Sequence, residues 1–290
     1  MEFQSYKKVG SVEECVSALK QIEGGVVLLA GGTDVLVKAR EGHRYADKTV
    51  VDIYGIPELC GISETETELV IGAGTTHAQI AGSPLVRWQA GVLADACRTV
   101  GSPQIRNHAT IGGNIANASP AADSLAALAV LEAEIEVNHL GEIRRMPLED
   151  AIEKPYRTTL GDRDLITRVI VKKIPHGSRC NFYKLGRRNA LSISRMTIAT
   201  LLNTDEAGKV TTFHMTMGAT FPKPMLFDDI DQMLIGKIPS EADIDAVAEA
   251  LSNKIPQIAG IRPSTVYKQP VCRKMVKRIL TQMLGGNEHE

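Results

Sequence analysis

The sequence has few aromatic residues and almost no net charge, and both absences narrow its function. Phe, Trp and Tyr make up 4% of the 290 residues, so aromatic platforms for stacking bases or sugars are not expected. The formal net charge of −1 gives no electrostatic basis for binding nucleic acid. No run approaches the roughly 18 uninterrupted apolar residues of a membrane span. The N-terminus also lacks a basic region followed by an apolar one, so we expect neither a membrane segment nor a secretory signal.

Cysteines are few and widely separated. They lie at Cys15, Cys60, Cys97, Cys180 and Cys272. No pair has the C-x-x-C spacing of zinc or iron–sulfur ligands, so we expect no metal site in this chain. An odd, scattered set of cysteines indicates reduced thiols, which predicts a cytoplasmic protein.

The length and the order of elements predict two domains, 1–175 and 176–290, with the first divided into subdomains at about 1–55 and 56–175. In the first subdomain, Ser11 begins a helix that reaches Ile22. Short apolar strands are expected over 26–30 and 49–53, so this part resembles a compact βαβ unit.

The second subdomain and the C-terminal domain have different patterns. Over 56–175, strands at 68–73, 135–137 and 168–174 alternate with helices at 76–81 and 93–100. The C-terminal domain is expected to have three antiparallel strands followed by helices. We expect the strands at 181–185, 192–202 and 209–217, with a hairpin turn at 203–208, and the helices at 226–235, 241–252 and 264–284. Strands first and helices afterwards predict an α+β fold.

Two pairs of adjacent glycines are the strongest ligand signals. In 28–35, an apolar strand runs into Gly31-Gly32, and in 109–114 a β-like run breaks into Gly112-Gly113. Glycine lets the backbone approach a ligand, and successive amides in such a turn can bind phosphate. Each pair could equally be a tight turn between core elements, with Asp34 as a helix N-cap. Two such loops in separate segments suit a diphosphate that lies between two subdomains.

The usual nucleotide motifs do not occur. Gly72-Ala-Gly-Thr-Thr-His77 comes nearest to the Rossmann fingerprint but lacks its third glycine, and there is no P-loop sequence. We interpret His77 as a structural hydrogen-bonding group, and Arg106 as a residue that pairs with a carboxylate or orients its loop. We assign no catalytic residue to this chain.

Five segments together resemble the FAD-binding subunit of the molybdenum hydroxylases, a family that includes xanthine, nicotinate and carbon monoxide dehydrogenases. They are Ala30-Gly-Gly-Thr-Asp34, Gly101-Ser-Pro-Gln-Ile-Arg-Asn107, Thr110-Ile-Gly-Gly-Asn-Ile115, Phe182-Tyr-Lys-Leu-Gly-Arg-Arg188 and the basic helix after Arg262-Pro-Ser. The similarity spans the whole chain. It implies a two-subdomain FAD-binding domain of the vanillyl-alcohol-oxidase/PCMH type, followed by the α+β C-terminal domain.

The resemblance also implies which residues contact FAD. The first glycine loop would hold the diphosphate from the first subdomain, through Leu28, Leu29, Ala30, Gly31, Gly32, Thr33, Asp34 and Val35. The second would hold it from the other side, through Ala109, Thr110, Ile111, Gly112, Gly113 and Asn114. Asp123 would bond the ribityl or ribose region, and Val100 and Gly101 would approach the isoalloxazine or the adenosine. Ile166 and Lys184 would make further flavin contacts.

By the same resemblance, FAD in this subunit collects electrons from a [2Fe-2S] small subunit and passes them as hydride to NAD⁺ or another acceptor. The molybdenum cofactor belongs to a large subunit that hydroxylates the substrate, so a hetero-oligomer is expected. The resemblance favours a xanthine or purine substrate, with nicotinate or another heterocycle or aldehyde as the alternative. Two other interpretations remain: an independent flavin oxidoreductase of the same fold, and a flavin-free scaffold or binding module.

Overall fold

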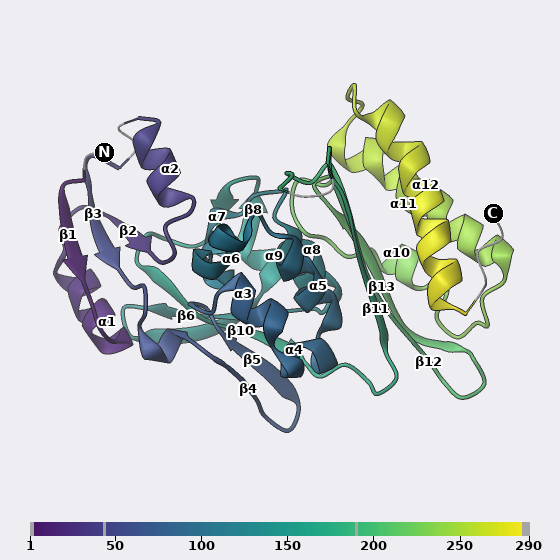
Figure 1. Ribbon diagram of the computed structural model, residues 1–290, viewed down its shortest axis with the longest axis horizontal. Coiled ribbons are helices and arrows are strands. Elements are labelled where there is room, and N and C mark those ends of the chain that lie inside the picture. The colour runs from purple at the N-terminus through teal and green to yellow at the C-terminus, as the bar shows by residue number, and fades with distance from the viewer. Residues whose placement is uncertain (1–2, 43–44, 189–190, 286–290) are drawn as a thin grey trace.

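The computed structural model describes residues 3–42, 45–188 and 191–285. The fold is α+β, as expected, and three main sheets follow one another from one end of the molecule to the other (Figure 1). The two parts of the N-terminal half contain the first two sheets, and the C-terminal part contains the third.

The first subdomain is a three-stranded parallel sheet in the order β1-β3-β2. Its elements are β1 (Ser5–Lys8), α1 (Val12–Gln21), β2 (Gly25–Leu29), α2 (Val35–Arg40) and β3 (Lys48–Asp52). The Ser11 hydroxyl accepts a hydrogen bond from the Glu14 amide at 3.0 Å, which starts α1 where the sequence predicts it. Cys15 and Leu19 of α1 pack with Val51 in a small separate core.

The second subdomain is a five-stranded antiparallel sheet in the order β4-β5-β10-β6-β7. Its strands are β4 (Ile62–Glu64), β5 (Glu68–Gly72), β6 (Glu134–His139), β7 (Glu142–Pro147) and β10 (Asp164–Lys172). Its helices are the 3-10 helix η1 (Pro57–Leu59), α3 (His77–Gly82), α4 (Pro84–Gln89), α5 (Gly91–Thr99), α6 (Pro103–His108), α7 (Ile111–Asn117), α8 (Asp123–Val130) and α9 (Leu148–Ala151). A two-stranded hairpin, β8 (Ile152–Lys154) and β9 (Arg157–Thr158), lies beside α7. A continuous core joins β5 and β10 to α3, α5, α7 and α8.

The C-terminal part has the expected three-stranded antiparallel sheet, β11 (Arg179–Leu185), β12 (Met196–Thr204) and β13 (Val210–Gly218), followed by α10 (Asp228–Asp231), α11 (Glu241–Ala259) and α12 (Thr265–Met283). The central strand β12 is buried on both faces. Ile198 and Leu202 pack against α11 and α12, whereas Ala199 and Leu201 belong to the core of the second subdomain. The sheet therefore separates the C-terminal helices from α5 and α8 (Figure 1).

Two predicted elements are shorter than the sequence indicates. The strand expected over 192–202 begins only at Met196, because Ser194 turns toward the second subdomain and donates its hydroxyl to Asp123. The helix expected over 226–235 is reduced to α10, because Gly236 and Lys237 pair through their backbones with Val210 and draw the chain out of the helix. Among the described residues, no helix is both long enough and apolar enough to cross a lipid bilayer.

Candidate functional site

Three neighbouring cavities lie along the junction of the first subdomain, the second subdomain and the C-terminal sheet. Their volumes are about 220, 200 and 540 Å³. The first and second cavities share Leu28, Ala30, Thr110, Gly113 and Ala116 as lining residues. The second and third share Asp34, Asn114, Asn117 and Tyr156. The cavities therefore adjoin end to end and offer space for one long ligand.

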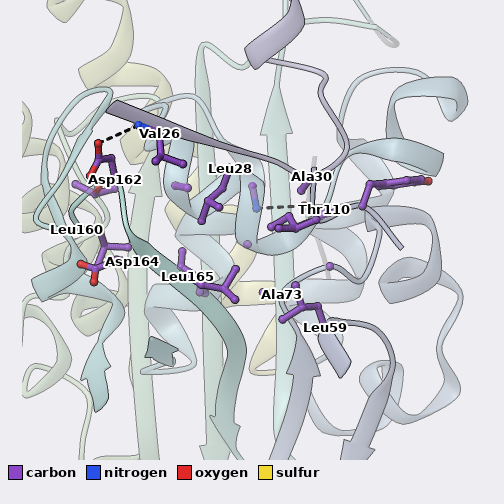
Figure 2. A pocket seen from close by; sticks show the side chains of 18 of the residues that line it. Val26, Leu28, Ala30, Leu59, Ala73, Thr110, Leu160, Asp162, Asp164 and Leu165 are labelled. Carbon is purple, nitrogen blue, oxygen red and sulfur yellow. Dashed lines mark hydrogen bonds between the residues drawn. The ribbon is translucent and has the colours of Figure 1, made fainter. Parts of the chain in front are cut away.

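The first cavity is mainly apolar and has carboxylates at one side. Figure 2 shows Val26 and Leu28 of β2 above Leu165 of β10, with Asp162 and Asp164 at the edge. Asp162 accepts a hydrogen bond from the Val26 amide at 3.1 Å, which joins the two subdomains. Burial raises the pKa of Asp164, but the Gly161 amide, His139 and Arg144 outweigh it and hold that pKa below its usual value. This carboxylate is therefore anionic at neutral pH.

The second cavity is bordered by the first glycine loop, which leaves β2 and enters α2. Gly31 fits because a Cβ there would lie 1.8 Å from the His108 carbonyl oxygen, and Gly32 has a φ of +71° that favours glycine. The backbone amides of 31–35 have no hydrogen-bond acceptor within the described part of the chain. Consecutive unpaired N–H groups at the head of a cavity form an anion-binding concavity.

The second glycine pair lies in the first turn of α7, and not in a turn whose amides are available to a phosphate as the sequence suggests. Thr110 is the N-cap of α7, and its hydroxyl accepts from the Gly113 amide at 3.2 Å. The Gly112 amide donates to the Ala73 carbonyl at 2.8 Å, so neither glycine presents a free amide to the cavity. A Cβ on Gly112 would lie 2.6 Å from that of Ala73, which shows that this glycine permits close packing. The expected amide clamp from both sides is therefore formed from one side only.

Nearly all predicted site residues line one of the three cavities. The first is lined by Leu28, Ala30, Thr110, Gly112, Gly113 and Ile166. The second is lined by Leu28, Ala30, Gly31, Gly32, Thr33, Asp34, Val35, Ala109, Thr110, Gly113 and Asn114. The third is lined by Asp34, Val100, Gly101, Asn114, Asp123 and Lys184. Leu29 and Ile111 line none of these three cavities.

A polar bridge across the second cavity includes residues that sequence reasoning missed. The Asn117 amide of α7 donates to Asp34 at 2.9 Å, and its carbonyl accepts from the Lys38 ammonium. Lys38 also lies 5.5 Å from the centre of the Tyr156 ring. Asp34 is the N-cap of α2, but its side chain makes no capping bond because it points to Asn117 instead. The spacing of Asp34 and Lys38, one helical turn apart, is the only sequence signal for this pairing.

The third cavity contains a buried ion pair between domains. The Lys184 ammonium of β11 lies 2.6 Å from an Asp123 carboxylate oxygen and 2.9 Å from the Thr99 carbonyl. Asp123 also accepts from the hydroxyls of Thr99 and Ser194. Two of the three ammonium hydrogens are therefore used by protein acceptors, which leaves one for another partner.

The entrance loop of the third cavity is fixed by an arginine. Arg106 donates to the carbonyl oxygens of Val100 and Gly101 at 3.0 and 3.2 Å, so it orients this loop. Leu191 and Ile193, which also line this cavity, are 55% and 82% exposed and give it an apolar rim.

Ile166 and Lys184, both expected at the flavin, lie at opposite ends of the row of cavities. Ile166 is in the first cavity and Lys184 in the third. His77 lies apart from both in the core, where its Nδ1 is 3.3 Å from the Cys97 sulfur. Within the described ranges, no group of three or more His, Cys, Asp and Glu side chains has the arrangement of a metal site.

Comparison with known proteins gives the family. Residues 1–174 match the family "FAD binding domain in molybdopterin dehydrogenase", and residues 181–283 match "CO dehydrogenase flavoprotein C-terminal domain". The chain is 33% identical to the nicotinate dehydrogenase FAD-subunit of Eubacterium barkeri, covering 89% of this chain and 90% of that one. It is 26% identical to the putative xanthine dehydrogenase FAD-binding subunit of Escherichia coli K12, covering 98% and 97%.

A solved structure has the same fold along nearly the whole chain. A chain of carbon monoxide dehydrogenase from Hydrogenophaga pseudoflava superposes with a TM-score of 0.87 at 27% identity, covering 96% of each chain. The two family matches, the cavities along the subdomain junction and this superposition agree. This chain is an FAD-binding medium subunit of the molybdenum hydroxylase family.

Proposed function

We propose that FAD lies along the three cavities, with its diphosphate on the unpaired amides of 31–35. The main support for this placement is that residues 31–35 line the middle cavity and that their amides have no acceptor among the described residues. The apolar first cavity suits the adenine, and the larger third cavity suits the isoalloxazine ring. This orientation assigns Ile166 to the adenosine end. The domain division at residue 175 is part of the same proposal.

Lys38 supplies the positive charge that balances the diphosphate in this placement. Its ammonium already lies at the second cavity, bound to Asn117 and above the Tyr156 ring. A charge-assisted hydrogen bond from ammonium to phosphate is stronger than the neutral bond to an amide carbonyl. The hydrogen bond to Asn117 therefore holds the Lys38 ammonium close to the proposed position of the diphosphate.

Lys184 and Asp123 hold the flavin end. Since Asp123 accepts from three side chains, its main task is to fix Lys184, whose remaining N–H faces a ring carbonyl or ribityl oxygen. Bound FAD supplies the chemistry that joins one-electron and two-electron transfer. A cation beside the ring stabilises added negative charge, so Lys184 favours reduction.

The chain works in a complex with a large subunit that carries the molybdenum cofactor and a small [2Fe-2S] subunit. The names of the relatives support this, since they are FAD subunits and medium chains of dehydrogenases. NAD⁺ is the proposed acceptor of the electrons. The sequence has no Rossmann fingerprint that would bind NAD⁺ at a separate site, so its nicotinamide reaches the flavin through the open third cavity. A cytoplasmic location completes this part of the proposal.

The substrate of the complex is an N-heteroaromatic of the nicotinate type. Identity of 33% to the nicotinate relative, against 26% to the xanthine relative, supports nicotinate ahead of the expected purine. The test is the molybdenum-loaded three-subunit complex, assayed with nicotinate, xanthine and NAD⁺ in separate reactions. Turnover of xanthine and not of nicotinate would reverse this preference.

FAD binding and the role of Lys38 are tested by Lys38→Met, with Arg40→Met on the same helix as the control. The purified chain is expected to be yellow and to release FAD. Lys38→Met is expected to weaken FAD binding by about tenfold to a hundredfold, because a charge-assisted bond is lost. Arg40 is exposed, so its variant should bind normally. A colourless chain that cannot be reconstituted with FAD overturns the proposed function. Equal affinities of both variants for FAD overturn only the role of Lys38.

A further inference from the structure

Ser194 joins the rim of the third cavity to the buried Lys184–Asp123 ion pair. Its side chain lines this cavity, and the residue is only 7% exposed, whereas the preceding Ile193 is 82% exposed. Within one residue the chain therefore passes from an exposed position to a buried one. The Ser194 hydroxyl donates a hydrogen bond to the Asp123 carboxylate. Ser194 thus belongs to the cavity and not to strand β12, which begins at Met196.

The two oxygens of the Asp123 carboxylate have different partners. Oδ2 accepts from the Lys184 ammonium at 2.6 Å and from the Thr99 hydroxyl at 3.0 Å. Oδ1 accepts from Ser194, which is its one hydrogen-bond donor within the described part of the chain. The Asp123 side chain is 4% exposed, so water does not readily replace the serine. Ser194 therefore satisfies one half of the carboxylate that balances Lys184.

The neighbouring Ser192 makes no such connection. Its hydroxyl accepts from the Arg187 amide at 2.9 Å and donates to the Ile193 carbonyl at 3.1 Å. Both contacts stay within the rim segment. Ser194 is thus the residue through which this segment reaches the ion pair.

The hydrogen bond from Ser194 changes how completely Asp123 balances Lys184. A hydrogen bond donated to a carboxylate draws part of its negative charge toward the donor. With Ser194 present, Asp123 therefore cancels less of the positive charge of Lys184. Charges interact more strongly where water is excluded, so the difference is felt by a group that lies beside the lysine in the cavity.

We propose that Ser194 is a positioning residue that raises the reduction potential of bound FAD through Asp123 and Lys184. This role rests on the proposed function, which places the isoalloxazine ring in the third cavity. The reduced ring carries more negative charge than the oxidised ring, so a less completely balanced Lys184 stabilises the reduced form more. Ser194 acts through the ion pair and needs no contact with the flavin.

A purely structural role for the same hydrogen bond gives a different expectation. If the bond only ties the rim segment to the second subdomain, its loss lowers the stability of the chain and leaves the potential unchanged. The reduction potential therefore separates the two roles, whereas thermal unfolding does not.

The test is a redox titration of the FAD-loaded full chain, followed by the flavin absorbance. Ser194→Ala is expected to lower the two-electron potential by about 15 to 30 mV, which is a roughly threefold to tenfold fall in the equilibrium constant of reduction. Ser194→Thr keeps the hydroxyl and should stay close to the wild type. Ser252→Ala is the matched control. Ser252 is also buried and donates one hydrogen bond, to the Gln269 carbonyl at 3.3 Å, but it lines none of the three cavities.

A lower potential in Ser194→Ala alone supports the proposal. Equal shifts in Ser194→Ala and Ser252→Ala overturn it, as does a shift in Ser194→Ala that Ser194→Thr does not reverse. An unchanged potential in Ser194→Ala, together with a lower one in Lys184→Met, overturns the role of Ser194 and leaves the placement of FAD intact. If neither variant shifts the potential, the ring does not lie beside Lys184, and the placement fails as well. A chain that binds no FAD is recognised beforehand by its absorbance, and it overturns the proposed function.

Discussion

His77, the first residue of α3, is fully buried against Cys97 of α5, and its protonation is therefore coupled to folding. Burial and the nearby Arg106 lower the pKa of His77 from 6.5 to about 4. Between these values the unfolded chain binds a proton that the folded chain does not. Stability is therefore complete above pH 6.5 and is lost as the pH falls toward 4.

We expect this one histidine to account for about 2 kcal/mol of the stability lost between pH 7 and pH 5. His77→Phe removes the titrating group and should flatten the profile by that amount. Urea unfolding at both pH values, on the wild type and the variant, measures the difference. If the wild type and His77→Phe lose the same stability between pH 7 and pH 5, His77 is accessible to protons in the folded state.

The Lys184–Asp123 pair is a second feature at this scale, because its side chains are only 15% and 4% exposed. Lys184→Met leaves a buried carboxylate without its cation and is expected to cost about 3 to 5 kcal/mol. Adding Asp123→Asn should recover much of that loss, since the charge is then gone. Urea unfolding of both variants tests this double cycle.

The control is Lys173→Met, which breaks a more exposed pair with Glu64 and should cost less than about 1 kcal/mol. A similar cost for Lys173→Met and Lys184→Met would mean that burial does not set the strength of the Lys184 pair. That result would also remove the argument that Asp123 fixes Lys184 for the flavin.

In helix α7, Gly112 allows close packing against Ala73. Gly112→Ala places a Cβ against Ala73 and is expected to destabilise the FAD-free chain by about 1 to 3 kcal/mol. Gly82→Ala, at the end of α3, has open space around the new Cβ and should be neutral or slightly stabilising. Thermal unfolding of the two FAD-free variants measures the contrast. If Gly112→Ala changes only FAD affinity, Gly112 is a ligand residue.

Much of the element order follows from the sequence, and the failures have physical causes. The amides of 31–35 have no acceptor among the described residues, because this segment lies between the last paired residue of β2 and the first residue of α2. At Gly112 the amide is taken by the Ala73 carbonyl, a tertiary contact that no local pattern reveals. Strand β7 is missed because most of its side chains are exposed, so it has no apolar alternation.

The pairing of distant residues is the part of the site that the sequence cannot supply. Lys184 is 61 residues from Asp123, and Asn117 is 83 from Asp34. Both pairs form only after the subdomains dock. The residue types are visible in the sequence, but the Lys184 pair depends on the docking of β11 onto the second subdomain, and the Asn117 pair on the docking of the first subdomain onto α7.

At the scale of the whole molecule, the row of three cavities lies between the first and second subdomains, whose hydrophobic cores differ greatly in size. The first subdomain packs around a small core that contains Cys15, Leu19 and Val51 and is completed by Leu165 of β10, whereas the second has a much larger core. A ligand that contacts both parts stabilises the weaker one, because it binds only the docked arrangement.

We therefore expect removal of FAD to loosen the first subdomain selectively. Amides of β2 and β3 should exchange with deuterium at least about tenfold faster without FAD, while those of β12 should change little. Hydrogen exchange followed by mass spectrometry on loaded and stripped protein tests this. Uniform acceleration in all three strands would indicate that the chain unfolds as one cooperative unit.

The contacts of Asn117 affect how fast a bound ligand leaves the cavities. This residue holds Asp34 and Lys38 of the first subdomain against α7, directly over the middle of the row of cavities. In the proposed placement, FAD would lie beside this bridge, and we expect it to leave more easily once both contacts have opened. We therefore expect the residence time of bound FAD to depend on how often this bridge opens, as well as on the strength of each single contact.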